Sequence, residues 1–257
     1  MSSWSRLSTR SLLCFTGLAL LCAGTSSAFR PSSRWLIQQA VSAQMERKVK
    51  TLHVEQEATL FGIPEAPRGL RAEERTWLRN PGDLRNELDL PAGTRVVLRT
   101  AKKQKVNEPA GSRRLDVDMP DLVRNFLAGG APLDNREMAT RMLGDLRRLD
   151  VNLDRVSYGR FQGRVVYIIG AKSGELAKAQ VWLDKDSLLL VRLIRPLPTP
   201  DGAPVVLQDT RLLGYGSPEG GNWFPKVVEV WQGDELRKRS VTRDVNRNKK
   251  LSNKLFR

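Results

Sequence analysis

The side chains that most often perform catalysis are scarce in this chain, and their spacing matches no catalytic pattern. Its single histidine, His53, lies in an alternating segment beside Glu55 and Glu57. A pair of histidines around a glutamate, a glycine-rich phosphate loop and a glycine-framed serine nucleophile are all missing from the sequence. A lone histidine on a strand is more typical of a partly exposed surface residue than of a general base or a metal ligand. We therefore expect no catalytic residue, no metal and no cofactor, in a protein that is not an enzyme.

Two short stretches hold paired carboxylates, Asp116-Val117-Asp118 and Asp184-Lys185-Asp186. Carboxylate pairs can divide acid and base work between them. Aspartate is also frequent in turns and at helix starts, because its side chain accepts hydrogen bonds from nearby backbone N–H groups. We interpret both pairs as turn and cap residues.

The first residues have the pattern of a secretory signal peptide. Arg6 and Arg10 precede an apolar stretch over 12–22, and Ser26-Ser27-Ala28 places small residues at a cleavage site. The apolar stretch is shorter than a membrane-spanning helix needs, which disfavours the alternative of an uncleaved anchor. Cleavage after Ala28 removes residues 1–28. We expect residues 29–257 to form a single exported domain.

Both cysteines, Cys14 and Cys22, fall within this predicted signal peptide. Leu21, rather than a small residue, precedes Cys22, which disfavours lipidation of that cysteine. The predicted mature chain therefore has no disulfide framework and no thiol nucleophile. Its stability must come from an ordinary hydrophobic core.

The chain is strongly basic. Its formal charge is +15, and it falls to +13 when Arg6 and Arg10 leave with the signal. Such a charge is typical of nucleic-acid-binding proteins, but an exported chain does not meet cytoplasmic nucleic acid. The compartment instead favours an anionic membrane surface or an acidic envelope polymer as partner. Basicity that serves solubility alone remains the alternative.

Helical spacing and strand-like alternation divide the predicted mature chain into elements. Ser33 is expected to cap a first helix, and two further helices are expected over 120–127 and from Asp134 to Leu149. Strands are predicted over 52–61, 70–79, 83–90, 94–106, 151–160, 164–171, 178–184, 188–195, 204–214, 223–232 and 235–246. Gln162-Gly163 and Gly233-Asp234 are typical of hairpin turns.

The strands over 164–195 are apolar on both faces, and Val165 to Ile169 run without a polar break. Either both faces pack in a core, or one face lines a cavity for an apolar ligand. A long antiparallel meander interrupted by helices tends to curl rather than stay flat. We therefore predict a mainly β fold with helices (α+β): one curved antiparallel sheet of about ten strands, an incomplete barrel with helices covering its concave face.

Four stretches taken together give a family resemblance. They are "TLHVEQEATLFG" after the N-terminal helix, "RTWLRNPGDLRNEL", "AQVWLDKDSLLLVRL" and "NWFPKVVEVW". In this order they resemble the periplasmic outer-membrane lipoprotein carrier family, the LolA type. The resemblance implies a hydrophobic cavity under a helical lid that shields the acyl chains of lipoproteins or another lipid. It also implies an inner-membrane release complex, an outer-membrane acceptor and a location in the periplasm of a Gram-negative-type envelope. We expect the protein to be a monomer.

The resemblance also implies particular site residues. In the family an arginine at the end of a Trp-x-x-Arg strand holds the helical lid. Trp77-Leu78-Arg79-Asn80-Pro81 resembles that pattern, with one residue fewer before the arginine and one extra residue before the proline, so Arg79 is the expected lid tether. A solvent-exposed strand-end arginine is the alternative. The expected lining of the lipid cavity is Trp77, Tyr167, Ile169, Trp182, Leu190 and Val228 from the strands, with Met138 and Met142 from a lid helix.

Two other functions for the same fold stay open. Extended loops over 62–69, 106–118 and 196–204 make the chain longer than the carrier pattern needs. A half-barrel of this kind can also serve as an envelope sensor of lipoproteins. It can equally be an adaptor that binds lipid or an anionic polymer without transport.

Overall fold

The computed structural model describes residues 30–63, 66–80, 82–100, 102–110, 117–128, 134–197 and 205–257. The predicted signal peptide lies outside these residues, and residues 31–257 belong to one compact unit. The described helices are α1 (Ser33–Met45), α2 (Asp121–Ala128) and α3 (Asn135–Arg148), with short 3-10 helices η1 (Pro218–Gly220) and η2 (Asn253–Phe256).

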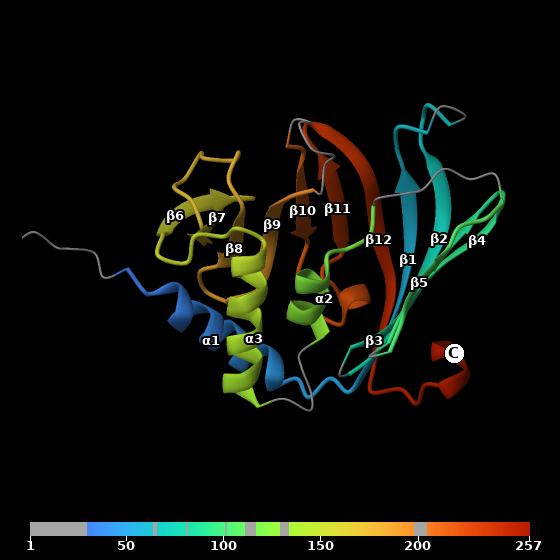
Figure 1. The fold of residues 1–257 in the computed structure, drawn as a ribbon, viewed down its shortest axis with the longest axis horizontal. Helices are drawn as coiled ribbons and strands as arrows, with labels where there is room; N and C mark the ends of the chain where they lie inside the picture. Colours follow the sequence, from blue (N-terminus) through green and yellow to red (C-terminus); the bar gives the residue numbers. More distant parts are fainter. Residues whose placement is uncertain are drawn as a thin grey trace, which may run out of the picture. The chain divides into compact units, whose positions relative to one another are not determined.

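The strands of the described residues form one sheet of twelve (Figure 1). They are β1 (Thr51–Leu60), β2 (Leu70–Arg79), β3 (Asp83–Leu90), β4 (Gly93–Arg99), β5 (Gln104–Asn107), β6 (Val156–Phe161), β7 (Arg164–Ile169), β8 (Gln180–Asp184), β9 (Leu190–Pro196), β10 (Leu207–Leu213), β11 (Val227–Gln232) and β12 (Glu235–Arg247). The sequence predicts about ten strands, with a single one over 94–106. That segment is instead a hairpin, in which Thr100 N–H donates to Lys103 O at 2.8 Å.

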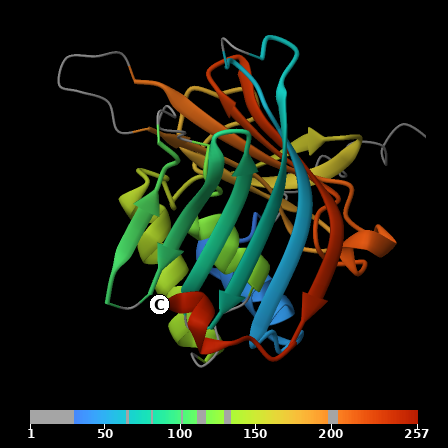
Figure 2. The ribbon, with the colours of Figure 1, turned by 90° about the vertical axis from the view of Figure 1, so that its right-hand side faces the viewer.

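The sheet order is β5-β4-β3-β2-β1-β12-β11-β10-β9-β8-β7-β6, and every neighbouring pair is antiparallel. The first and last strands pair in the middle of the sheet, while β5 and β6 form its two edges. Helices α2 and α3 occupy the chain between those edge strands. Figure 2 shows the sheet curving around the helices, which lie on its concave side. The predicted fold class is therefore confirmed.

Local sequence signals explain where several elements begin and turn. Asp134 accepts from Glu137 N–H and Glu137 reaches back to Asp134 N–H, the capping box that starts α3. The cap of α1 is Ser32 rather than the predicted Ser33, since the Ser32 side chain accepts from Trp35 N–H. Gln162 and Gly163 have φ angles of 50° and 78°, as a two-residue hairpin turn between β6 and β7 requires.

The main core lies between the helices and the concave face of the sheet. One face of α1, which includes Leu36, Ile37 and Ala40, packs there against the inward-facing side chains of the strands. Strands β7 to β9 are buried on their other face as well, in a second cluster of Val166, Ile168, Ala171, Trp182 and Val191. Both faces of the apolar meander are therefore packed, which explains its lack of polar residues.

Candidate functional site

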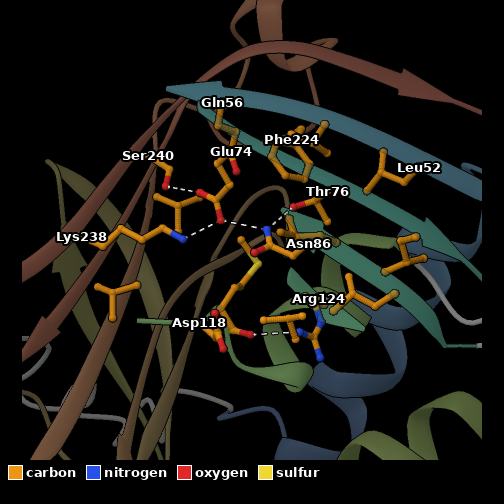
Figure 3. A pocket seen from close by; sticks show the side chains of 18 residues that line it. Leu52, Gln56, Glu74, Thr76, Asn86, Asp118, Arg124, Phe224, Lys238 and Ser240 are labelled. Atoms are coloured by element: carbon orange, nitrogen blue, oxygen red, sulfur yellow. Dashed lines mark hydrogen bonds and ion pairs between the residues drawn. The ribbon is translucent and has the colours of Figure 1, made fainter. Parts of the chain in front are cut away.

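A cavity of about 50 Å³ lies between the concave face of the sheet and helix α2 (Figure 3). At roughly 10–15 Å³ per water on this measure, it has room for a few water molecules and not for an acyl chain. Three alternate residues of each of two strands face it, as strand alternation requires: Leu52, Val54 and Gln56 of β1, and Glu74, Thr76 and Leu78 of β2. Its wall is completed by side chains from β3, β4, β11, β12, the segment before α2 and Phe224.

The cavity changes from apolar to polar along the strands. At one end Leu52, Leu78 and Leu84 lie side by side on neighbouring strands, and Phe224 lines the same cavity (Figure 3). Four residues further along β1 and β2, the same faces carry Gln56 and Glu74. The register of the sheet thus gives the cavity an apolar end and a polar end.

The polar end is built around a buried ion pair. Glu74 accepts hydrogen bonds from Lys238 Nζ at 2.6 Å, Ser240 Oγ at 2.7 Å and Asn86 Nδ2 at 3.0 Å (Figure 3). We call these four residues the Glu74 cluster. Burial raises the pKa of Glu74, but the Lys238 charge and the three hydrogen bonds outweigh it and hold that pKa below its ordinary value. Glu74 is therefore a charged carboxylate at neutral pH.

A second buried cation, Arg95 of β4, connects the sheet to helix α2. It is 2% exposed, and its guanidinium contacts both oxygens of Asp118, at 2.8 and 3.0 Å. Its Nε also lies 2.9 Å from an oxygen of Glu108. Burial raises the pKa of Asp118, but the hydrogen bond and charge of Arg95 pull it below its usual range. Because Asp118 lies just before α2, Arg95 fixes where that helix begins.

Two more arginines hold the same end of α2. Arg99, four residues after Arg95 on the same face of β4, forms an ion pair with Asp121 in the first turn of the helix. Arg124 of α2 pairs with Asp121 as well. Burial, and then the charge of Arg99, lower the pKa of Arg124. The ion pair between Arg99 and Asp121 thus holds α2 against the sheet, in addition to the apolar contacts of the helix.

The residues predicted to line the cavity lie in different parts of the structure. Val228 lines it. Tyr167, Ile169, Leu190, Met138 and Met142 lie instead in the main core, packed between the helices and the sheet.

Two of the predicted lining residues face away from the cavity. Trp77 stacks on His53, with ring centroids 5.1 Å apart, because the even-numbered residues of β2 face the cavity. Trp182 belongs to the second cluster on the outer face of β8, where the Arg192 guanidinium lies 4.5 Å from its ring centroid. In both strands the face is the opposite of the predicted one, since adjacent residues alternate in direction.

Arg79 also differs from its expected role. It donates to Asp83 Oδ2 at 2.7 Å and to Asn253 Oδ1 at 2.6 Å, and its guanidinium lies 4.5 Å from the ring centroid of Phe256. These contacts tie β2 to the C-terminal η2 rather than to a helix on the concave face. Among the described residues, the arginine that links the sheet to α2 from a buried position is Arg95.

Replacing Arg79 with methionine is expected to loosen residues 253–257 and leave the helices unchanged. A partly exposed ion pair and one ring contact contribute only about 1 kcal/mol. Amide hydrogen exchange should speed up in η2 alone. Arg71→Met, at an exposed position of the same strand, serves as the control. Faster exchange in α2 or α3 of the Arg79 variant would restore its assignment as the lid tether.

The sequence analysis missed the Glu74 cluster and Arg95. One signal was present in the sequence: Glu74 alternates in phase with Ala72, Thr76 and Leu78, so a strand with one buried face places its charge inward. The partners Lys238 and Asp118 carried no such signal. Lys238 comes close to Glu74 only because β12 pairs with β1 in a particular register. Asp118 comes close to Arg95 only because the chain turns back after β5.

The described part of the chain contains no helix long and apolar enough to cross a membrane. It also contains no group of three or more histidine, cysteine, aspartate or glutamate side chains placed to hold a metal ion.

The geometry defines a class of protein: an open half-barrel whose concave face and helices enclose a small cavity with one apolar end. The fold is shared with a DUF1329 family protein from Desulfovibrio piger, with a TM-score of 0.51 at 16% identity over 89% of this chain and 98% of that one. A LolA superfamily protein from Nitrosomonas europaea matches with a TM-score of 0.46 at 10% identity over the same shares. No protein-family model and no curated protein sequence matches the chain. At these identities the likeness is one of fold.

Proposed function

We propose that this protein binds lipid acyl chains in its cavity and carries them, as part of a lipoprotein or another lipid, through the periplasm toward the outer membrane. The observation that carries the proposal is the apolar end of the cavity, placed between a curved sheet and a helix held by ion pairs. No catalytic role is assigned to any residue. The signal-like N-terminal sequence supports export.

The cavity, at about 50 Å³, is too small for an acyl chain, so helix α2 has to move before a chain can enter. Each buried methylene stabilises the bound state by about 0.8 kcal/mol, so a chain of ten or more methylenes supplies several kcal/mol. That gain is enough to break the two ion pairs beside α2: the buried Arg95 with Asp118, which contributes about 1.5–3 kcal/mol, and the more exposed Arg99 with Asp121, which contributes about 1 kcal/mol or less. A carrier also needs ties that can reform, because it has to release its cargo.

Filling the cavity is expected to abolish lipid binding. Val54 is 2% exposed and lines the cavity, and Val54→Phe places a ring in the space that a chain would use. Binding of a fluorescent fatty-acid analogue should weaken by about tenfold or more, a change of roughly 1.4 kcal/mol or more in binding free energy. Val228→Leu, a smaller change at the cavity wall, should weaken binding by less.

The matched control is Val166→Phe, which overfills an equally buried site on the outer face of β7. Both phenylalanine variants should lose about 1–3 kcal/mol of stability. Only Val54→Phe should lose the ligand. If the Val54→Phe variant bound the fatty-acid analogue as tightly as wild type, the cavity would not be the lipid-binding site.

Transport requires a second experiment. Purified protein should accept a lipoprotein from inner-membrane vesicles that contain the release complex and hand it to an outer-membrane acceptor. An envelope sensor or adaptor would bind lipid or polymer and complete no transfer. Transfer without loss of cargo to the buffer supports the carrier.

A further inference from the structure

A second hollow, which we call the arginine cleft, lies between α2, α3 and strands β4 and β9. Its volume is about 360 Å³, several times that of the cavity. Four arginines line it: Arg99 from β4, Arg141 and Arg148 from α3, and Arg195 from β9. Strands β4 and β9 lie near opposite ends of the sheet order. Only the curvature of the sheet brings both to one cleft.

The arginine cleft adjoins the apolar cavity. Asp118 and Met119 line both spaces, so one short segment separates them. Leu127 of α2 and Leu78 of β2 lie on the cavity side of that segment. A molecule that is charged at one end and apolar at the other would contact both spaces if its chain entered the cavity beside Met119 when α2 moves.

Several guanidinium donors of the cleft have no acceptor within the described residues. Arg99 Nε is buried without a hydrogen-bond partner there. Arg141, exposed on α3, makes no ion pair or side-chain hydrogen bond with the described part of the chain.

The three carboxylates of the cleft already have basic partners. Asp118 binds Arg95, Asp121 binds Arg99 and Arg124, and Asp145 binds Arg148. The carboxylates are therefore engaged, while donors remain for a ligand.

Gathering arginines in a partly buried place has an electrostatic cost. Burial lowers the pKa of Arg99, and the charge of Arg99 adds to the burial that lowers the pKa of Arg124. An anion in the cleft would relieve this repulsion. Guanidinium groups present planar forks of N–H donors that match the oxygens of phosphate, so phosphate is the anion that this geometry fits best.

We propose that the arginine cleft binds the phosphate of an anionic amphiphile, with Arg99 and Arg141 as donors, while its acyl chain enters the adjoining cavity. The inference rests on the proposed lipid-binding function and extends it, because it names a phosphate-bearing lipid as a ligand. The acylated cysteine of a lipoprotein carries no phosphate and would use the cavity alone.

The test compares two soluble short-chain ligands with identical acyl chains, a phosphatidylglycerol and a diacylglycerol. Wild-type protein should bind the phosphate-bearing lipid about tenfold more tightly, and this preference should shrink as salt screens the charges. Arg141→Gln should remove most of the preference and leave diacylglycerol binding unchanged. Arg136→Gln is the matched control, since Arg136 is also exposed on α3 but lies outside the cleft. Arg99→Gln tests the second donor.

The outcomes separate this inference from the proposed function. Equal affinity for both lipids, or the same behaviour of the Arg141 and Arg136 variants, would overturn the phosphate site while lipid binding stands. Binding of neither lipid would overturn both proposals. Inorganic phosphate is the third ligand. Binding of free phosphate as tight as that of the phospholipid would show a phosphate site independent of the acyl chain and would also overturn the proposal.

Discussion

Replacing Glu74 with leucine is expected to destabilise the protein by about 3–5 kcal/mol, because it leaves the Lys238 ammonium buried without its partner. Both side chains are 6% exposed, so water cannot replace the lost contact without opening the sheet. Ser240 and Asn86 would also lose their acceptor on this carboxylate. Urea unfolding gives the measurement, as a lower midpoint at an unchanged slope.

The double variant Glu74→Leu, Lys238→Met is the decisive control. Replacing both members of a buried ion pair with apolar residues of similar size is often neutral or stabilising, so most of the lost stability should return. A double variant as unstable as the single one would mean that the loss came from packing rather than from an unpaired charge. The double variant also removes the ion pair at the polar end of the cavity and should not weaken the binding of an apolar chain.

The same pair predicts how stability depends on pH. The pKa of Glu74 is lower in the folded protein than its ordinary value, so the unfolded chain binds a proton first as the pH falls. The stabilisation from this pair is present above the unfolded pKa, at about 4.3, and is lost as pH drops through the folded pKa. Wild type and the double variant should therefore differ in the pH dependence of unfolding below about pH 4.5.

Replacing Arg95 with methionine should cost about 2–3 kcal/mol and release the start of helix α2. The expected loss is smaller than at Glu74, because Asp118 and Glu108 are partly exposed and can regain water. Amide exchange over 117–128 should accelerate more than in the strands. If α2 opens to admit ligand, the variant should also bind a fluorescent fatty-acid analogue faster.

Arg75 supplies the matched control on the convex face. It also contacts two carboxylates of β3, Glu87 at 3.4 Å and Asp89 at 2.7 Å, but it is about one-third exposed. Arg75→Met should therefore cost about 1 kcal/mol or less, with no change at α2. Equal effects of the two substitutions on α2 exchange would show that Arg95 does not tether the helix.

The sequence predicted those features that depend on neighbouring residues. The capping box at Asp134, the turn at Gln162-Gly163 and the apolar strands over 164–195 all appear where the pattern places them. The extra strand β5 was missed because the four residues of its turn contain neither glycine nor proline.

By itself, the sequence thus determined the elements, the antiparallel class and the curvature, because caps, turns and hydrophobic alternation act over a few residues. Only the tertiary structure decided which side chains meet. Lys238 is 164 positions from Glu74, and Arg79 is 174 positions from Asn253. Such pairs depend on how β12 aligns with β1 and where the C-terminal segment returns. A shift of one residue in a strand moves all its side chains to the other face, as Trp77 and Trp182 show. The cavity, its ion pair and the arginine cleft follow from that long-range register.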